Sequence, residues 1–104
     1  MIMLSLIIPV YNGEKFLRKC LDSIFLPNTP LEFFEVIIVN DGSPDKSLDV
    51  IYEYTSRFSN IILFSQENKG LGEARNSGVK IAKGDRILAA FVSSFSFLLK
   101  TIPK

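Results

Sequence analysis

Three short polar segments contain the side chains of this chain that could do chemistry. They are residues 9–13, 40–45 and 66–72, and each follows an apolar run with the length of a β-strand. In an open parallel sheet, ligands bind beyond the carboxyl ends of the strands, where such segments meet. We therefore expect these three loops to form a ligand-binding site.

Two side chains in these loops have the chemistry to hold a planar heterocycle. Asp41 follows an apolar run and precedes Gly42, and its carboxylate could accept an N–H from a base edge or bind ribose hydroxyls. Tyr11 ends the first apolar run, and its ring could stack on a base. The alternatives are that Asp41 or Ser43 only caps the next helix, and that Tyr11 is a packed residue at the rim of the sheet.

The third loop imitates a dinucleotide-binding fingerprint without matching it. Residues 70–75 read GLGEAR, so Arg75 stands where the third glycine would be, and the segment follows the third apolar run instead of the first. These departures argue against a dinucleotide site. Flexible backbone at a helix start, with Arg75 one turn later, suits an anionic or carbonyl-bearing ligand. The alternative is an ordinary glycine loop beside a solvated arginine.

Composition excludes several kinds of chemistry. The chain has 12 Lys and Arg against 11 Asp and Glu, a net charge of +1, which argues against a nucleic-acid partner. It has no His and one Cys, so imidazole metal ligands, thiolate clusters and Ser-His-Asp catalysis are excluded. We expect Cys20, on an apolar helical face, to lie in the core. A single cysteine allows no internal disulfide, which suggests a reducing, cytoplasmic setting.

The elements that must position these loops alternate along the chain. Apolar runs predict four strands, at residues 3–10, 33–39, 60–65 and 86–92. Residues at helical spacing predict three helices between them, within residues 16–25, 48–58 and 71–82. We expect Asn12 and Ser43 to be N-caps, Pro44 to open the second helix and Gly84 to end the third. This β-α-β-α-β-α-β order predicts a three-layer α/β/α, Rossmann-like fold with a mainly parallel sheet.

The C-terminal part of the chain departs from this pattern. Residues 87–99 are apolar apart from three serines, and they are fewer than the roughly 20 residues that a membrane span needs. We expect a buried strand followed by an apolar end, which divides the chain into an α/β domain at 1–92 and a tail, not native to the fold, at 93–104. An alternative is that the tail makes the chain form homo-oligomers through exposed apolar surface.

Three segments taken together resemble the family 2 glycosyltransferases of the GT-A fold. They are residues 7–12 (IIPVYN), 36–43 (VIIVNDGS) and 68–78 (NKGLGEARNSG), and Gly84-Asp85 continues the pattern. The match covers residues 4–88 in order, and it is specific as a set although each segment alone is weak. The resemblance implies the N-terminal, nucleotide-binding half of a GT-A nucleotide-diphospho-sugar transferase fold.

The resemblance implies a nucleotide-sugar donor, usually a UDP-sugar, whose sugar is transferred to a hydroxyl of a glycan or lipid-linked acceptor. It also implies six donor-binding residues: Pro9, Tyr11, Asn12, Glu14, Asp41 and Arg75. The first three would line the base pocket, with Tyr11 against the ring and Glu14 on the same wall. Asp41 would accept the base N–H, and Arg75 would reach a base carbonyl or the diphosphate.

The sequence departs from the family at the metal site. The family places an Asp-x-Asp motif, which holds Mg²⁺ or Mn²⁺ on the donor diphosphate, shortly after a strand that corresponds to residues 86–92. Residues 86–104 contain no Asp or Glu, and neutral hydroxyls such as those of Ser93 and Ser94 are poor replacements for anionic ligands. We therefore assign no metal ligand and no catalytic residue in this chain.

These points predict a glycosyltransferase-like chain that ends early or has an altered tail. We expect it to bind a nucleotide but to be inactive alone, with the acceptor half and the general base of the family beyond residue 104. Two alternatives stay open: a nucleotide-binding module without catalysis, and a dimerising structural fragment. We expect the chain in the cytoplasm, including the cytoplasmic face of the membrane, in polysaccharide biosynthesis.

Overall fold

One five-stranded sheet, with strand order β3-β2-β1-β4-β5, organises the molecule. The computed structural model describes residues 2–27, 29–93 and, as strand backbone, 97–102. In chain order the elements are β1 (Leu4–Val10), α1 (Glu14–Ile24), the short 3-10 helix η1 (Leu31–Phe33), β2 (Phe34–Asp41), α2 (Ser47–Thr55), β3 (Ile61–Gln66), α3 (Leu71–Ile81), β4 (Arg86–Val92) and β5 (Phe97–Ile102).

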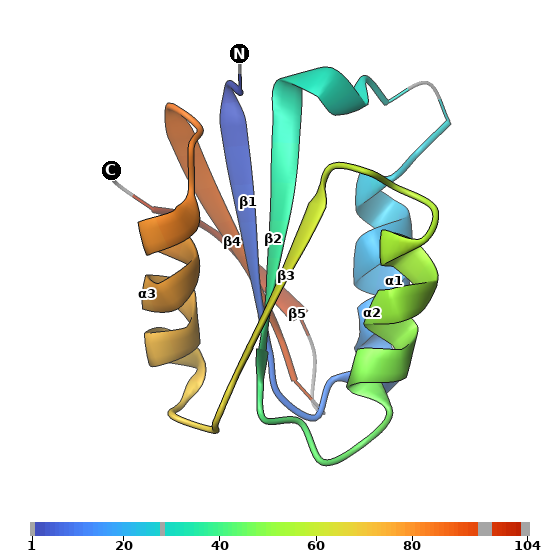
Figure 1. Cartoon of the computed structure of the whole chain (residues 1–104), viewed down its shortest axis with the longest axis vertical. Helices are drawn as coiled ribbons and strands as arrows, with labels where there is room; N and C mark the ends of the chain where they lie inside the picture. The colour runs from blue at the N-terminus through green and yellow to red at the C-terminus, as the bar shows by residue number, and fades with distance from the viewer. Residues whose placement is uncertain (1, 28, 94–96, 103–104) are drawn as a thin grey trace.

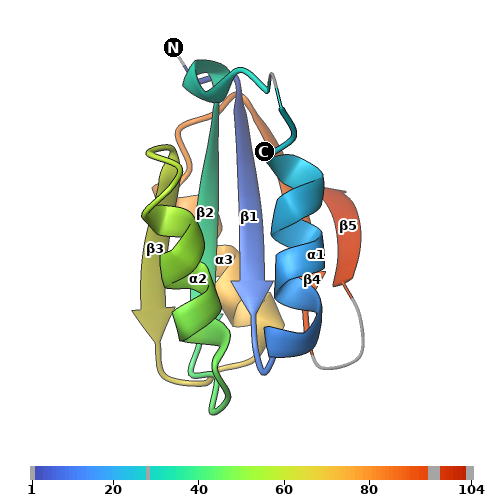
Figure 2. The same ribbon diagram turned by 90° about the vertical axis from the view of Figure 1, so that its right-hand side faces the viewer.

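The helices cover the sheet in three layers. Helices α1 and α2 lie on one face and α3 lies on the other, as Figures 1 and 2 show from two directions. Strand β1 pairs in parallel with β2 and β4, and β2 pairs in parallel with β3. The predicted α/β/α arrangement with a mainly parallel sheet is therefore confirmed, and the four predicted strands all form.

The two central strands are apolar in their middle parts because both of their faces are buried. Alternate residues of a strand point to opposite faces, so Ile8 packs in one core with Leu17 and Leu21, while Ile7 packs in the other with Val39. Gly78 lets α3 approach the sheet closely, since a methyl group there would lie 2.4 Å from Cγ2 of Ile7. The sheet is thus held between two separate apolar cores.

A buried polar network closes the amino-terminal edge of the sheet. Ser5 Oγ donates to Glu35 Oε2 at 2.6 Å, and the same carboxylate oxygen accepts the Lys83 N–H at 2.6 Å. The Gly84 N–H donates to Ser5 Oγ at 2.8 Å, and a methyl group on Gly84 would lie 2.6 Å from the Ser5 nitrogen. The Gly84-Asp85 turn therefore fixes the start of β4.

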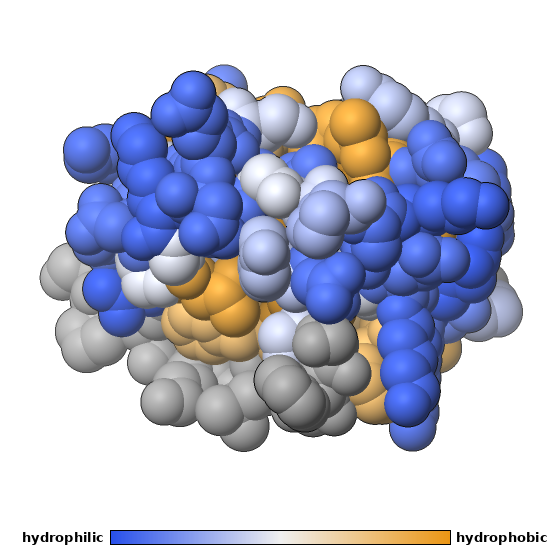
Figure 3. All heavy atoms as spheres, turned by 90° about the horizontal axis from the view of Figure 1, so that it is seen from below, coloured by the Kyte–Doolittle hydropathy of each residue, from blue (hydrophilic) through white to orange (hydrophobic). Residues whose placement is uncertain are grey.

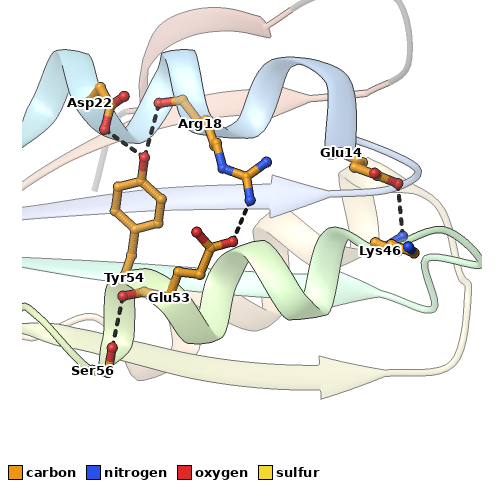
Figure 4. A network of polar contacts seen from close by, with 7 residues as sticks. All are labelled: Glu14, Arg18, Asp22, Lys46, Glu53, Tyr54 and Ser56. Atoms are coloured by element: carbon orange, nitrogen blue, oxygen red, sulfur yellow. Dashed lines mark hydrogen bonds and ion pairs between the residues drawn. The ribbon is translucent and has the colours of Figure 1, made fainter.

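Side chains also join α1 to α2 (Figure 4). The Tyr54 hydroxyl donates to Asp22 Oδ1 at 2.5 Å, and Arg18 forms an ion pair with Glu53. Burial, helped by the bond to Asp22, raises the pKa of Tyr54 to about 12. Because the ion pair is half-exposed, it contributes little, and the tyrosine is the stronger link between the two helices.

The predicted helix ends are wrong at three places. Asn12 is not the N-cap of α1, because it has a φ of 54° and Gly13 takes the cap position. Helix α2 begins at Ser47 and not at Pro44, with Lys46 as its N-cap. Helix α3 ends at the C-cap Ala82, before Gly84. In the first two cases the predicted caps are instead engaged in hydrogen bonds between loops, which are described below.

The C-terminal end adds a strand that the sequence did not reveal. Strand β5 pairs antiparallel with β4, so that Val92 is opposite Phe97. Residues 97–102, which were expected to belong to an apolar tail, therefore form an edge strand of the sheet, and the division at residue 92 stays a prediction. The predicted association surface consists of Phe91, Phe95, Phe97, Leu98 and Leu99. Phe91 is partly buried against the core, while the other four side chains lie outside the described residues, as does Ser94. A helix able to span a bilayer is not found in the described part of the chain.

Candidate functional site

The three predicted loops meet at the carboxyl-terminal edge of the sheet. Strands β1, β2 and β3 run in the same direction, so their following loops lie together at the lower end of the molecule in Figures 1 and 2. Figure 3 looks onto this edge and shows hydrophilic atoms at both sides with apolar surface between them. The expectation that the loops after β1, β2 and β3 share one edge is confirmed.

The first two loops are joined by hydrogen bonds between side chains and backbone N–H groups, which we call the clasp (residues 12–14 with 43–47). The Glu14 N–H donates to Asp45 Oδ2, and the Lys46 N–H donates to Glu14 Oε1, both at 3.0 Å. Figure 4 shows the second of these bonds. The Asp45 carboxylate thus accepts a hydrogen bond from the start of α1, and the Glu14 carboxylate accepts one from the start of α2.

Two serines complete the clasp. The Asn12 N–H donates to Ser43 Oγ at 3.1 Å, and the Gly13 N–H donates to Ser47 Oγ at 2.9 Å. Asparagine is one of the few residues besides glycine that adopt the left-handed conformation, and these bonds hold Asn12 there at φ 54°. The loop after β1 is therefore shaped by residues more than 30 positions away.

Asp45 also accepts two hydrogen bonds from Ser47 within the clasp. Its Oδ1 accepts the Ser47 N–H at 3.0 Å and the Ser47 hydroxyl at 2.6 Å. Burial alone would raise the pKa of Asp45, but the bonds from Ser47 and from the Glu14 backbone outweigh it and leave the pKa below its ordinary value of 3.8. Sequence reasoning missed Asp45 and Ser47, although Asp side chains in turns commonly accept the N–H two residues later in the chain.

Tyr11 and Pro9 occupy different environments. Tyr11 is half-buried, and its N–H donates to the Val92 carbonyl at 3.1 Å, which fixes its backbone at the end of β1. Among the described residues its ring has no aromatic partner, so one face could receive a planar ligand. Pro9 is buried within β1 opposite Val39, and because proline has no N–H the pairing with β4 is interrupted there.

Asp41 is fully buried, and its carboxylate accepts four hydrogen bonds from the last residue of β3 and the loop that follows it. Oδ1 accepts Gln66 Nε2 and the Lys69 N–H, both at 2.9 Å. Oδ2 accepts Asn68 Nδ2 at 3.1 Å and the Gly70 N–H at 2.9 Å. We call this arrangement the Asp41 junction. It satisfies the buried charge without a cation, because hydrogen bonds to a charged acceptor are stronger than neutral ones.

Arg75 and Glu14 are not joined to Tyr11 or Asp41. The Arg75 guanidinium donates to Asn76 Oδ1 at 2.7 and 3.1 Å, and no hydrogen bond or ion pair in the described residues links it to Asp41. Glu14 instead borders a hollow of about 420 Å³ beside the clasp. The lining of this hollow consists of Asn12, Glu14, Lys15, Arg18 and Asp45. The structure therefore places the six predicted residues at one edge without gathering them around one cavity.

The residues after β4 do not fit a divalent metal ion. Strand β4 ends at the buried Val92, and residues 86–104 contain no carboxylate, whereas Mg²⁺ and Mn²⁺ prefer anionic oxygen ligands. Among the described residues, no group of three or more Asp, Glu, Cys or His could hold a metal. No chemical step can therefore be assigned to a metal in this chain.

Comparison with known proteins adds independent evidence about this fold. The family model for Glycosyl transferase family 2 matches residues 5–92. The poly(ribitol-phosphate) beta-glucosyltransferase of Bacillus spizizenii is 39% identical over 97 residues, which are 91% of this chain and 15% of that protein. The putative glycosyltransferase EpsH of Bacillus subtilis is 44% identical over 90 residues, 86% of this chain and 25% of that one. The chain thus spans about a quarter or less of these relatives.

Solved structures also resemble this chain. The crystal structure of S. aureus TarS 1–349 in complex with UDP-GlcNAc superposes with a TM-score of 0.80 at 32% identity, covering 86% of this chain and 26% of that one. The mannosyltransferase PcManGT from Pyrobaculum calidifontis, solved with GDP-Man and Mn²⁺, has a TM-score of 0.72 at 22% identity, over 85% of this chain and 26% of that one. This second likeness supports the fold alone.

Proposed function

The chain belongs to glycosyl transferase family 2, and from this membership we propose that the carboxyl edge of its sheet binds the nucleoside diphosphate part of a sugar donor. The observation that carries the proposal is the similarity to TarS, a protein solved with UDP-GlcNAc, over 86% of this chain. A UDP-sugar is accordingly the donor we propose.

In this proposal Tyr11 stacks on the base. Its backbone is fixed by Val92 and its ring has no aromatic partner in the described residues, so it can cover a base with little loss of conformational freedom. Asn12 lies next to it in a loop held by the clasp. Pro9, buried in β1, shapes the floor of the site, and Glu14 fixes the loop wall through Lys46.

Arg75 is the cation that we propose for the diphosphate or a base carbonyl. It lies in the second turn of α3, and its present partner is a neutral amide oxygen, which a phosphate can displace because charge-assisted bonds are stronger. Two roles are open to Asp41, which either accepts the base N–H or holds the neighbouring loop.

The transfer of the sugar to a glycan or lipid-linked hydroxyl is part of the proposal for the whole protein. In the family a divalent metal supplies charge stabilisation of the departing diphosphate, and residues 86–104 offer no carboxylate for it. We therefore propose that this chain alone binds the donor without transferring its sugar. Incubation with UDP-sugars, Mn²⁺ and hydroxyl acceptors should release no UDP, and steady release would contradict this.

Calorimetric titration with UDP tests the binding proposal. Stacking of a base on an aromatic ring is worth about 1–3 kcal/mol, so Tyr11→Ala should weaken UDP binding by about fivefold or more. Tyr52→Ala is the matched control, because Tyr52 lies on α2 with 55% of its surface exposed and should not affect binding. No binding by the unaltered chain, or equal binding by Tyr11→Ala, would overturn the proposal.

Repeating the titration with Mn²⁺ separates a metal-independent nucleotide-binding module from a metal-dependent enzyme. The lack of carboxylates after β4 favours the module, so we expect the UDP affinity to be the same with and without the metal. A metal-dependent rise in affinity would show that other residues of the chain hold the cation.

A further inference from the structure

We propose that strand β3, at one edge of the sheet, is a docking surface for a second copy of this chain, so that two sheets join into one across a two-fold axis. Strand β3 pairs with β2 on one side, and no described strand pairs with its other side. We call this surface the β3 edge (residues 61–66 with Leu48, Tyr52 and Thr55 of α2). It is separate from the proposed nucleotide site and from the apolar C-terminal residues.

The sequence of β3 lacks the features that usually keep edge strands from pairing with other chains. Such strands commonly carry charged residues, proline or a bulge. Strand β3 reads IILFSQ, without charge or proline, and its register with β2 runs without interruption from Ile61 to Gln66. Ile61, Ile62 and Phe64 are residue types that favour strands. Strand β3 is therefore suited to strand addition.

The hydrogen bonds to β2 determine the register that a second copy would take. The Val36 N–H donates to the Asn60 carbonyl at 3.0 Å, and parallel pairing alternates from there. The backbone N–H and C=O groups of Ile61, Leu63 and Ser65 therefore face outward. An antiparallel copy engages all three residues only when Leu63 lies on the two-fold axis, opposite Leu63 of the other copy. Ile61 of each copy then lies opposite Ser65 of the other.

This register covers an exposed aromatic ring on the face of the sheet that carries α3. Ile62 packs against the core on that face, and Phe64, two residues later, points to the same face with 42% of its surface exposed. Ile62 of each copy would lie opposite Phe64 of the other in a non-hydrogen-bonded pair, where side chains are closest. Pairs of an aromatic and a β-branched residue stabilise neighbouring strands.

Helix α2 adds an apolar contact on the other face. It packs over β2 and β3, beside the free edge (Figure 2), and its Glu53 and Tyr54 face α1. Leu48, Tyr52 and Thr55 share the flank of α2 away from α1, and Tyr52 is 55% exposed. Across the axis the two α2 helices would be two strand spacings apart, about 10 Å, which is a distance at which helices pack.

The size and charge of the β3 edge suit a weak dimer. Six strand residues extend for about 20 Å, and the sheet layer and the α2 layer together are about 20 Å high. About 400 Å² from each copy, or about 800 Å² in total, is at the low end for specific interfaces. None of the residues of the β3 edge is charged, so the two-fold axis brings no like charges together within it. We therefore expect a dimer that dissociates on dilution.

Sedimentation equilibrium over a range of concentrations tests the dimer. The mass of the unaltered chain should rise from 11.7 kDa towards twice that value. Phe64→Lys should weaken association by about tenfold or more, because it places a charge on the paired strand. Phe33→Lys is the matched control, since it makes the same change at a 49% exposed side chain in η1, at the other end of the molecule (Figure 1), and should have no effect.

Two results of this experiment would overturn the proposal. One is an unaltered chain that stays monomeric at every concentration. The other is equal association of the Phe64→Lys and Phe33→Lys chains, both shown to be folded by circular dichroism, because association would then use another surface, such as the apolar C-terminal residues.

Disulfide cross-linking tests the register. Leu63→Cys should form a covalent dimer under mild oxidation, because residues of a hydrogen-bonded antiparallel pair have Cα atoms about 5.5 Å apart, which a disulfide can span. Ser65→Cys is the matched control, since the two Ser65 positions would be about 13 Å apart. The native Cys20 is buried and should not react. No link in Leu63→Cys, or equal linking of both variants, would overturn the proposed pairing.

Discussion

The clasp spreads its bonds over four acceptor side chains, whereas the Asp41 junction collects four donors on one carboxylate. In the clasp, Ser43, Ser47, Asp45 and Glu14 each accept a different backbone N–H. In the junction, Asp41 accepts all four side-chain and backbone donors of the neighbouring loop. The loop after β1 is therefore held redundantly, and the loop after β3 depends on a single residue.

Removing the carboxylate of Asp41 should have the largest effect. Asp41→Ala leaves four donors without their charged acceptor, and we expect the free energy of unfolding to fall by about 3 kcal/mol. Asp45→Ala removes a helix-capping acceptor while three others remain, so we expect a loss of about 1 kcal/mol. Urea denaturation of both variants measures the difference. Equal losses of stability would contradict the view that the junction depends on one residue and the clasp on several.

Gly70 sharpens the comparison because the junction needs a backbone conformation that is nearly exclusive to glycine, whereas the positive φ in the clasp is adopted by Asn12. Gly70→Ala should lower the free energy of unfolding by about 1–2 kcal/mol, because φ 97° strains any residue with a side chain. Gly72→Ala is the matched control, since Gly72 lies inside α3 with open space around it, and alanine there should stabilise by up to about 1 kcal/mol. Two similar losses in thermal unfolding would contradict the assigned backbone strain.

Of these predicted effects, the smallest should be the pH dependence that Asp45 in the clasp gives to the stability of the chain. The pKa of Asp45 lies below 3.8 in the folded chain, so its stabilising contribution is present above that pH and is lost as the pH falls through the lowered value. Between pH 5 and about pH 2 the unaltered chain should therefore lose more stability than Asp45→Asn. Urea titrations at several pH values measure this, and parallel curves for the two proteins would contradict it.

The parts of the fold that depend on residues close together in the sequence could be predicted from the sequence. The apolar runs of β1 and β2 indicate strands buried on both faces, and parallel pairing then brings the loops of Tyr11 and Asp41 to one edge. The start of α1 could not be predicted in the same way, because Asp45 accepts the Glu14 N–H from 31 positions away. Strand β5 was missed because its residues read as an apolar tail, and only the antiparallel pairing with β4 shows that they form a strand.

The candidate site shows the same limit. Residue type indicated that Asp41 would be an acceptor, and the structure agrees, but the donors come from the loop 25–29 positions later in the chain. Nothing in the local sequence distinguishes a carboxylate that is free to bind a ligand from one that accepts hydrogen bonds from a neighbouring loop. Arg75 likewise looked available, although Asn76 accepts its guanidinium N–H groups.

The most direct test of the nucleotide site is a titration of the isotope-labelled chain with UDP, followed by backbone amide resonances. We expect shifts at residues 11–13, at 41 and 42, and at 68–72, where the loops after β1, β2 and β3 meet. The amides of Glu35 and Gly84 at the opposite edge should stay unchanged. Shifts centred on that opposite edge, or none at millimolar UDP, would contradict a nucleotide site at the carboxyl ends of the strands.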